Sequence, residues 1–523
     1  MRSKFMPWAD LAPEFRQLEE ARAQIKLLQE ALQTEKEKQR DKSITGASTS
    51  VISLFNPSSF ETSLSSFRWH LAYCVPNSRV DSIFDFDAFS HQLSYSVRPL
   101  YPPETTRLIQ IEWPSHLMIQ QSIEYFSTNR LYAIFPMVDV DSLAVLLQSH
   151  SFDHDGRNFD VASRACLVAL TAFITRIRHH ETAFAHANPN AYVQAVLSLI
   201  PELIRHHTNV RTLEALLILV PELLMSMAVR VLCNLGGYKT KADSQEFCEI
   251  QNPKHLRALF WLLYSLDKEM SLRKCQPPLI NDADCDLDLP VNYVSVSSDH
   301  QFFEYQLSLN ELLFPTDLRL ALLKSKIYQQ LYSYSSLNKP EATRIQLIRE
   351  LDQELVELKS QFPGVCQPEG YVSGGIPDFL LHDLSLRGIN IHLEYYHCLA
   401  KIHGASTIGI TSVPKAVSPP SSSMELCYEA SRSTLIYLSR ARHLIMPETF
   451  WIYAQFIMTA AIALYQRLTA KPTEVHSRQD IRLLEDVLGI FRQLRQADDG
   501  HRFPPFAITE ALVEQLILSV KSS

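Results

Sequence analysis

Four aspartates alternate in the segment NDADCDLDLP, and carboxylates at such spacing could hold a metal ion. They are Asp282, Asp284, Asp286 and Asp288. A calcium-binding loop needs glycine at position 6 and glutamate at position 12, whereas Leu287 and Tyr293 stand there. Metal-dependent all-α synthases would need adjacent aspartates on a helix, and this run has no adjacent pair. The pattern therefore favours a structural loop, and a metal-dependent all-α enzyme ranks third among the hypotheses for this chain.

The histidines and cysteines also lack the spacing of catalytic or metal sites. His179, His180 and His186 lie close together around Glu181, but a metalloprotease helix requires H-E-x-x-H. The 9 cysteines are scattered and never form a C-x-x-C pair, which is typical of reduced thiols in the cytosol or nucleus. The chain contains no phosphate-binding loop, dinucleotide fingerprint or G-x-S-x-G elbow. We therefore predict no catalytic, cofactor-binding or metal-binding residue, and no enzymatic activity.

The composition indicates a helical protein without an overall basic surface. The chain has 13 glycines in 523 residues, about 2.5%, against roughly 7% in average usage. Sheets built from short strands need turn residues such as glycine roughly every 8–12 residues, whereas helices do not. The formal net charge of −8 is not typical of a protein that holds DNA by neutralising its phosphates. Any DNA contact would need a small basic segment.

Apolar residues recur at helical spacing along most of the chain, which predicts an all-α, multi-helical fold. The predicted helices are Leu117–Phe126, Ala162–Ile177, Tyr192–Ile204, Leu213–Leu219, Leu223–Leu235, His255–Met270, Leu318–Tyr332, Arg344–Leu358, Gly388–Ile402, Leu426–Leu444, Phe450–Leu468, Arg482–Leu494 and Ile508–Val520. Residues 449–468 have the length of a membrane span. Because polar side chains interrupt this stretch and its neighbours are amphipathic, we predict a buried central helix and no membrane association.

The N-terminal residues show a heptad pattern. An apolar residue recurs every seventh position at Leu11, Leu18, Ile25 and Leu32. Leu28 belongs to a partial second seam, and the other positions are mostly polar. This pattern favours a short coiled coil that forms a homo- or heterodimer, and the alternative is an amphipathic helix that docks on its own body. A Ser/Thr-rich linker follows.

These patterns divide the chain into four parts. The coiled-coil helix occupies residues 1–42, and the linker occupies residues 43–66. A regulatory region is predicted for residues 67–300, and a C-terminal helical region for residues 301–523. The C-terminal region contains a loop rich in Ser, Pro and Thr at residues 404–423.

The segment HLRALFWLLYSLDKEMSLRKCQPPLINDADCDLDLP, residues 255–290, carries several motifs in a fixed order. An arginine precedes aromatic residues, a Y-x-x-D helix end follows, and alternating acids lead to Leu-Pro. The residues concerned are Arg257, Trp261, Asp267, Asp284, Asp286, Leu289 and Pro290. Together they resemble the middle homology region of fungal six-cysteine, two-zinc cluster transcription factors. The helix at 226–239 is similar to the family's M-A-x-R helix through Arg230, and the resemblance covers residues 105–300.

The resemblance implies a zinc cluster that reads DNA and a following coiled coil that dimerises, with the partner setting the half-site spacing. No six-cysteine array precedes the heptads, and the first cysteine is Cys74. We therefore expect no zinc or other cofactor in this chain, and DNA contact only through a module supplied by a partner or a missing exon. The connection at 220–226 is also shorter than in the family, although Pro221 can open a new helix there.

The function that the resemblance implies is transcription regulation in the nucleus. Members commonly control metabolic or secondary-metabolite gene sets, and a small-molecule inducer is an expected partner. The alternative is a non-transcriptional α-helical scaffold or adaptor, which the acidic charge and the lack of a DNA-reading module favour. The absence of a fixed repeat of the kind found in helical arrays counts against this alternative.

Overall fold

The computed structural model describes the body of the chain as helices. The described residues are 111–129, 131–152, 155–179, 181–206, 209–219, 222–239, 252–290, 293, 312–362, 367–368, 385–407, 421–445, 450–470, 476–497 and 505–522. Within these ranges there are fifteen α-helices, α5 to α19, and no strand, so the predicted all-α fold is confirmed. No helix in these ranges is long and apolar enough to cross a membrane. The predicted coiled coil at 1–42 and linker at 43–66 lie outside the described residues.

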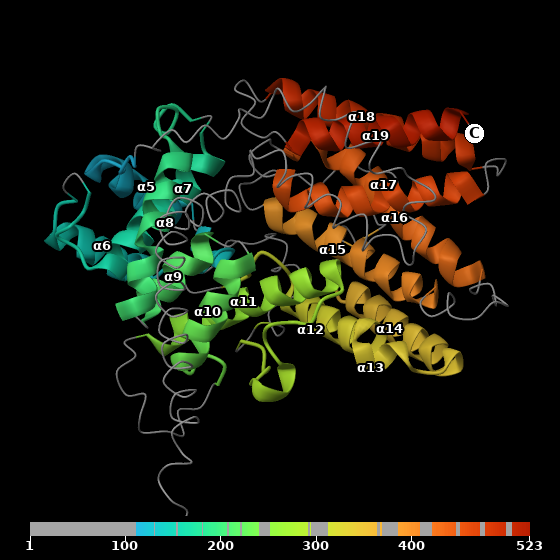
Figure 1. Ribbon diagram of the computed structural model, residues 1–523, viewed down its shortest axis with the longest axis horizontal. Coiled ribbons are helices and arrows are strands. Elements are labelled where there is room, and N and C mark those ends of the chain that lie inside the picture. The colour runs from blue at the N-terminus through green and yellow to red at the C-terminus, as the bar shows by residue number, and fades with distance from the viewer. Residues whose placement is uncertain are drawn as a thin grey trace, which may run out of the picture. The chain divides into compact units, whose positions relative to one another are not determined.

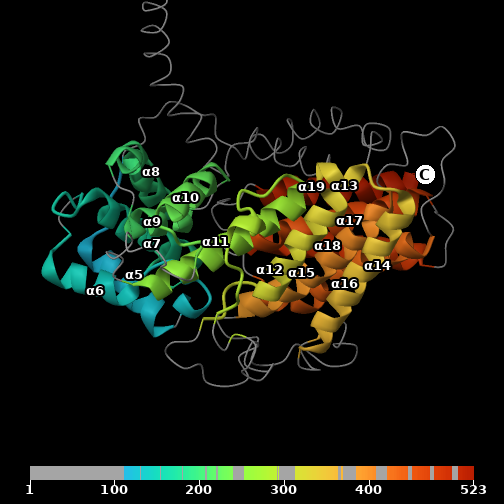
Figure 2. The same ribbon diagram turned by 90° about the horizontal axis from the view of Figure 1, so that it is seen from below.

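Residues 111–239 contribute the N-terminal helical region. Its helices are α5 His116–Thr128, α6 Val140–Ser149, α7 Val161–Ile177, α8 Pro189–His206, α9 Val210–Leu219 and α10 Glu222–Asn234. Several of these helices have a side-chain N-cap. At the start of α6, for example, the Asp139 carboxylate accepts a hydrogen bond from the Ser142 N–H. Helix α7 packs against α5, α8 and α9 (Figure 2) and buries the whole stretch from Ala165 to Ala172. It is therefore the central helix of this region.

Residues 312–522 contribute the C-terminal helical region. Its helices are α12 Leu318–Ile327, α13 Tyr334–Leu337, α14 Glu341–Ser360, α15 Ser385–Gly404, α16 Ser421–Ala441, α17 Phe450–Ala470, α18 Ser477–Ala497 and α19 Pro505–Ser522. Helices α16 to α19 lie side by side (Figure 1), and α15 packs against α12, α14, α16 and α17. Since α15 has neighbours on several sides, most of its side chains are buried.

Helix α11, Pro253–Lys274, is shared between the two regions. In the first half of α11, the side chains of Phe260 and Trp261 are both buried, at 0% exposed. Its last turn contributes Leu272 to the core of the C-terminal helices, and α11 also packs along α12. A segment before α12 makes a second connection, because the N–H groups of Leu313 and Phe314 both donate to the Ala133 carbonyl oxygen. The buried Arg387 of α15 donates to the carbonyl oxygens of the same two residues.

The predicted helices are present, most of them extended by a few residues. The stretch 318–332 departs from the prediction, because α12 ends at Ile327 and a π-turn, Tyr328–Tyr332, follows. There the Ser333 N–H donates to the Tyr328 carbonyl oxygen, five residues earlier. Helix α10 begins at Glu222, one residue before the predicted start at Leu223, and Pro221 lies outside the described residues. Of the predicted loop at 404–423, residues 408–420 lie outside the described residues, and α16 already begins at Ser421.

The apolar stretch at 449–468 forms α17, Phe450–Ala470, and is buried in the C-terminal core. Tyr453, Phe456 and Ile457 are all at most 2% exposed. Helix α17 packs against α15, α16, α18 and α19. The prediction of a buried central helix is therefore confirmed: neighbouring helices cover its apolar surface.

Candidate functional site at the α11–η5 segment

Helix α11 and the turn after it carry most of the motif residues identified in the sequence. The Asn252 side chain caps the helix by accepting from the His255 N–H at 3.1 Å, and Pro253 occupies the first turn, where its missing N–H costs nothing. Helix α11 ends at Lys274, and Cys275 then adopts a left-handed conformation with φ of 50°. This reversal sends the chain back along α11 as the loop 276–281 and the 3-10 turn η5, Asp282–Asp284.

An arginine–aromatic cluster fills the first half of α11. The Arg257 guanidinium lies 4.2 Å from the centre of the Phe260 ring and 5.2 Å from that of Trp261. It also donates to the carbonyl oxygen of Asp286, so the arginine ties the acidic run to the helix. Burial lowers the pKa of Arg257, and nearby Asp286 partly offsets that effect. The predicted motif residues Arg257, Trp261 and Asp286 are thus brought together.

Asp267 holds the returning loop by its backbone. Its side chain is 2% exposed, and its two carboxylate oxygens accept from the N–H groups of Leu279 at 2.8 Å and Ile280 at 3.1 Å. Burial raises the pKa of Asp267, which the adjacent Lys268 partly offsets. The aspartate of the Y-x-x-D motif is therefore a structural residue that fixes the loop against the helix end.

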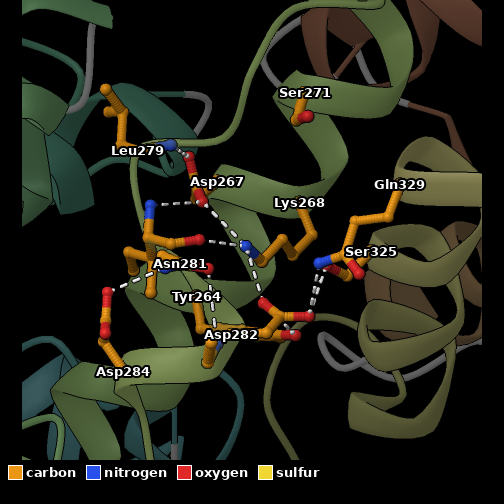
Figure 3. Close-up of polar contacts among 12 residues, drawn as sticks. Tyr264, Asp267, Lys268, Ser271, Leu279, Asn281, Asp282, Asp284, Ser325 and Gln329 are labelled. Carbon is orange, nitrogen blue, oxygen red and sulfur yellow. Dashed lines mark hydrogen bonds and ion pairs between the residues drawn. The ribbon is translucent and has the colours of Figure 1, made fainter. Parts of the chain in front are cut away.

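Lys268 and Asp282 extend this arrangement to α12, as Figure 3 shows. The Lys268 Nζ lies 2.9 Å from Asp282 Oδ1, 3.4 Å from Asp267 Oδ2 and 4.8 Å from the centre of the Tyr264 ring. The Tyr264 hydroxyl donates to Asp282 at 3.2 Å, and Ser325 of α12 donates to the same carboxylate at 2.6 Å. We call Asp267, Lys268 and Asp282 the loop network. It joins α11, η5 and α12.

The other predicted motif residues lie toward the surface. Asp284 is exposed and accepts from the Asn281 side chain at 2.8 Å. Leu289 and Pro290 are half-buried, and the Pro290 carbonyl oxygen accepts from the Tyr293 N–H at 2.9 Å. Arg230 is exposed on α10, away from the loop network. The structure thus groups the motif residues of α11 with the acidic run but does not bring Arg230 to them.

A second set of buried charges was not identified from the sequence. On one face of α15, five polar side chains recur at intervals of three or four residues, and each is at most 9% exposed. They are Arg387, Asn390, Glu394, His397 and Lys401. Lys324 of α12 lies 2.9 Å from Glu394 Oε1 and forms an ion pair with Glu269 of α11. We call Glu269, Lys324 and Glu394 the inter-helix network.

The charges of the inter-helix network shift one another's protonation. Burial alone would raise the pKa of Glu269, but Arg273 and Lys324 outweigh it and lower that pKa. Burial and the neighbouring Glu269 raise the pKa of Glu394, against the attraction of Lys324. Burial, with nearby cations, lowers the pKa of His397 to about 3, so its imidazole is neutral at pH 7. The only sequence signal for these buried charges was the helical spacing of the polar residues in α15. That spacing predicts a face exposed to solvent, so it did not indicate burial.

Neither network has the form of a metal or catalytic site. In the part of the chain that the structure describes, no group of three or more His, Cys, Asp or Glu side chains converges as metal ligands would. The described cysteines are all free thiols, and a binuclear zinc cluster would need several thiolates around each metal. The described residues therefore do not fit the zinc cluster of the family named above. The carboxylates are instead occupied by lysines, arginines and backbone N–H groups.

Known proteins resemble this chain at low identity. The ABC-transporter-regulating transcription factor of Aspergillus oryzae is 24% identical over 335 residues, which cover 58% of this chain and 36% of that protein. Its namesake in Aspergillus fumigatus is 23% identical over 339 residues with the same coverage. The fusaridione A cluster transcription factor of Fusarium heterosporum is 23% identical over 437 residues, covering 77% of this chain and 76% of that protein. These relatives are fungal transcription factors.

The extent of the match differs between these relatives. The chain spans 36% of the length of each Aspergillus protein, but most of the length of the Fusarium protein. No family model matches the chain.

Proposed function

We propose that this chain is a fungal-type transcription regulator that acts in the nucleus on a metabolic or secondary-metabolite gene set. The observation that carries the proposal is the similarity to the Fusarium heterosporum cluster transcription factor, which extends over 77% of this chain and 76% of that protein. A likeness that spans most of both chains favours a shared role over a shared fragment. In this proposal the helical body is the regulatory part and has no catalytic activity.

The finer assignment, to the middle homology region of zinc binuclear-cluster factors, is also part of the proposal. Its support is the ordered set of motifs from Arg257 to Pro290, together with the loop network to which Asp267 of the Y-x-x-D motif belongs. Because the Asp267 carboxylate accepts two backbone N–H groups, the Y-x-x-D motif has a clear structural purpose. We infer that this motif serves to shape the end of one long helix in this chain.

Dimerisation through the heptad residues is the proposed route to DNA. Leu11, Leu18, Ile25, Leu28 and Leu32 would form the seam. A partner or another segment would then supply the basic reading module, because a net charge of −8 gives this chain little attraction for phosphates. A small-molecule inducer would act on the helical body.

Chromatin immunoprecipitation of the tagged chain in its native cells tests the proposal. We expect enrichment at a limited set of promoters and altered transcripts from the adjacent genes when the gene is deleted. A chain that stays outside the nucleus, with no promoter enrichment, would overturn the proposal and favour the helical scaffold.

A pair of variants tests the dimer separately. Ile25→Lys places a charge in the seam, whereas Gln33→Lys adds the same charge at an outer position. We expect promoter enrichment and recovery of a differently tagged copy to be lost for Ile25→Lys and kept for Gln33→Lys. If the two variants behave alike, the proposed dimer seam is wrong, whereas the proposed regulatory function is not affected.

A further inference from the structure

The end of α11 brings a thiol against an amine of α15. The Sγ atom of Cys275 lies 3.4 Å from the Nζ atom of Lys401. The same Nζ donates to the Arg273 carbonyl oxygen at 3.4 Å, which holds the amine beside the helix end. Lys401 is 7% exposed, whereas Cys275 is half-buried and is followed by exposed Gln276. Cys275 thus stands at a partly exposed chain reversal, while the Lys401 side chain beside it is buried.

A second thiol and a phenol complete the cluster around this pair. A Cβ added at Gly404 would lie 3.8 Å from the Cys427 Sγ and 4.0 Å from the Tyr332 hydroxyl oxygen, so these two groups share one location. The Tyr332 hydroxyl donates to the Lys401 carbonyl oxygen, and its ring centre lies 5.4 Å from the Lys401 Nζ. Burial raises the pKa of Cys427 to about 11, which keeps that thiol protonated and unreactive. Of the two thiols, Cys275 is the one that contacts the Lys401 amine.

We propose that Cys275 is an oxidation site at which a hydroperoxide makes a sulfenic acid that is then captured by the amine of Lys401. In the first step the sulfur attacks one peroxide oxygen, the O–O bond breaks, and water leaves. The sulfur loses two electrons and the peroxide gains them. In the second step the Lys401 ammonium gives up a proton to water and the resulting amine attacks the sulfur, the S–O bond breaks, and the nitrogen gives up a further proton as water leaves. One thiol, one amine and one hydrogen peroxide thus yield one sulfenamide and two waters.

The product would join α11 to α15 by a covalent S–N bond. These helices already meet through the ion pairs of Lys324, which contacts Glu269 on α11 and Glu394 on α15. The sulfenamide would add a cross-link that forms only under oxidising conditions and that excess thiol reverses. This inference does not depend on the proposed regulatory function.

Peptide mapping of the purified full chain after treatment with hydrogen peroxide tests the proposal. After digestion without reductant we expect a linked peptide pair that contains Cys275 and Lys401. Its mass would be about 2 Da below the sum of the two peptides, because two hydrogens are lost overall, and dithiothreitol would release both. Cys233 and Cys285, which are also half-buried, serve as internal comparisons in the same digest.

The Lys401→Arg variant keeps a cation at the position but replaces the amine. In this variant we expect the linked pair to disappear and Cys275 to be recovered as a sulfenic acid trapped by dimedone. Wild-type protein in which Cys275 stays reduced while Cys233 or Cys285 is oxidised would overturn the oxidation site. Oxidised Cys275 with a free Lys401 peptide, or a disulfide from Cys275 to another cysteine, would overturn the capture step. Because these outcomes come from wild-type protein, the test holds even where the variant fails to fold.

Discussion

The loop network begins at Asp267 of α11 and the inter-helix network at Glu269, two residues later, but the charges of the two networks are balanced in different ways. In the loop network, Asp267 accepts two backbone N–H groups, so part of its charge is balanced by hydrogen bonds. In the inter-helix network, Lys324 is 0% exposed and stands between two carboxylates from two other helices. A buried charge balanced mainly by other charges is left uncompensated when one partner is removed. Loss of one charged partner should therefore lower the free energy of unfolding more in the inter-helix network than in the loop network.

The largest expected effect is that of Lys324→Met, which leaves Glu269 and Glu394 facing each other without their shared cation. We expect a loss of about 3–5 kcal/mol in the free energy of unfolding, measured by urea denaturation followed by circular dichroism. Lys326→Met is the matched control, because Lys326 is exposed and pairs with the partly exposed side chain of Glu354, so its cost should be at most about 1 kcal/mol. Equal costs for the two variants would contradict the distinction between the networks.

The next effect is a dependence of stability on pH that comes from His397. Because burial lowers its pKa to about 3, the unfolded chain binds a proton at this imidazole below a pH of about 6.5 and the folded chain does not. Stability is thus present above that pH and is lost as the pH falls toward 3, by up to about 1.4 kcal/mol per pH unit.

The variant His397→Gln should flatten this dependence. Urea denaturation of the two proteins between about pH 6.5 and about pH 4.5 measures the difference, with the exposed His443→Gln as the control. A wild-type slope that persists in His397→Gln would show that other groups carry the acid sensitivity.

A smaller loss of unfolding free energy is expected when Asp267 of the loop network is replaced. Asp267→Asn keeps one acceptor oxygen but turns an N–H of the amide toward a backbone N–H, so one of the two hydrogen bonds is lost. We expect a cost of about 2 kcal/mol in unfolding free energy, because a hydrogen bond to a charged group contributes about 1.5–3 kcal/mol. Exposed Asp288→Asn should cost less than about 0.5 kcal/mol. Hydrogen exchange of the Leu279 and Ile280 amides should accelerate only in Asp267→Asn.

The smallest effect is expected for Arg230, a motif residue on α10 that belongs to neither network. Because it is exposed on α10, Arg230→Ala should change the unfolding free energy by less than about 0.5 kcal/mol. The same denaturation assay measures it. A cost above about 2 kcal/mol would show that Arg230 has a structural role comparable with that of Asp267.

Part of the site was predictable because its partners are close in sequence. Asp267, Lys268 and Asp282 lie within one segment, and the motif order from Arg257 to Pro290 singles out that segment without any knowledge of the fold. The position of Ser325 in the same network was not predictable, because nothing in the sequence near α12 indicates which helix it meets. The π-turn at Tyr328–Tyr332 was likewise missed, since its hydrogen bonds depend on how the chain packs after α12.

The sequence by itself determined the helices, because glycine scarcity and apolar periodicity are local properties of the chain. Only the tertiary structure decided which polar faces are buried. The face of α15 that carries Glu394 and Lys401 has the spacing of a solvent-facing stripe, and its burial follows from the contacts of α15 with α11, α12 and α16. A lone buried charge is unfavourable and is tolerated only when a partner that is distant in the sequence neutralises it. A local sequence pattern therefore cannot predict which charges are buried.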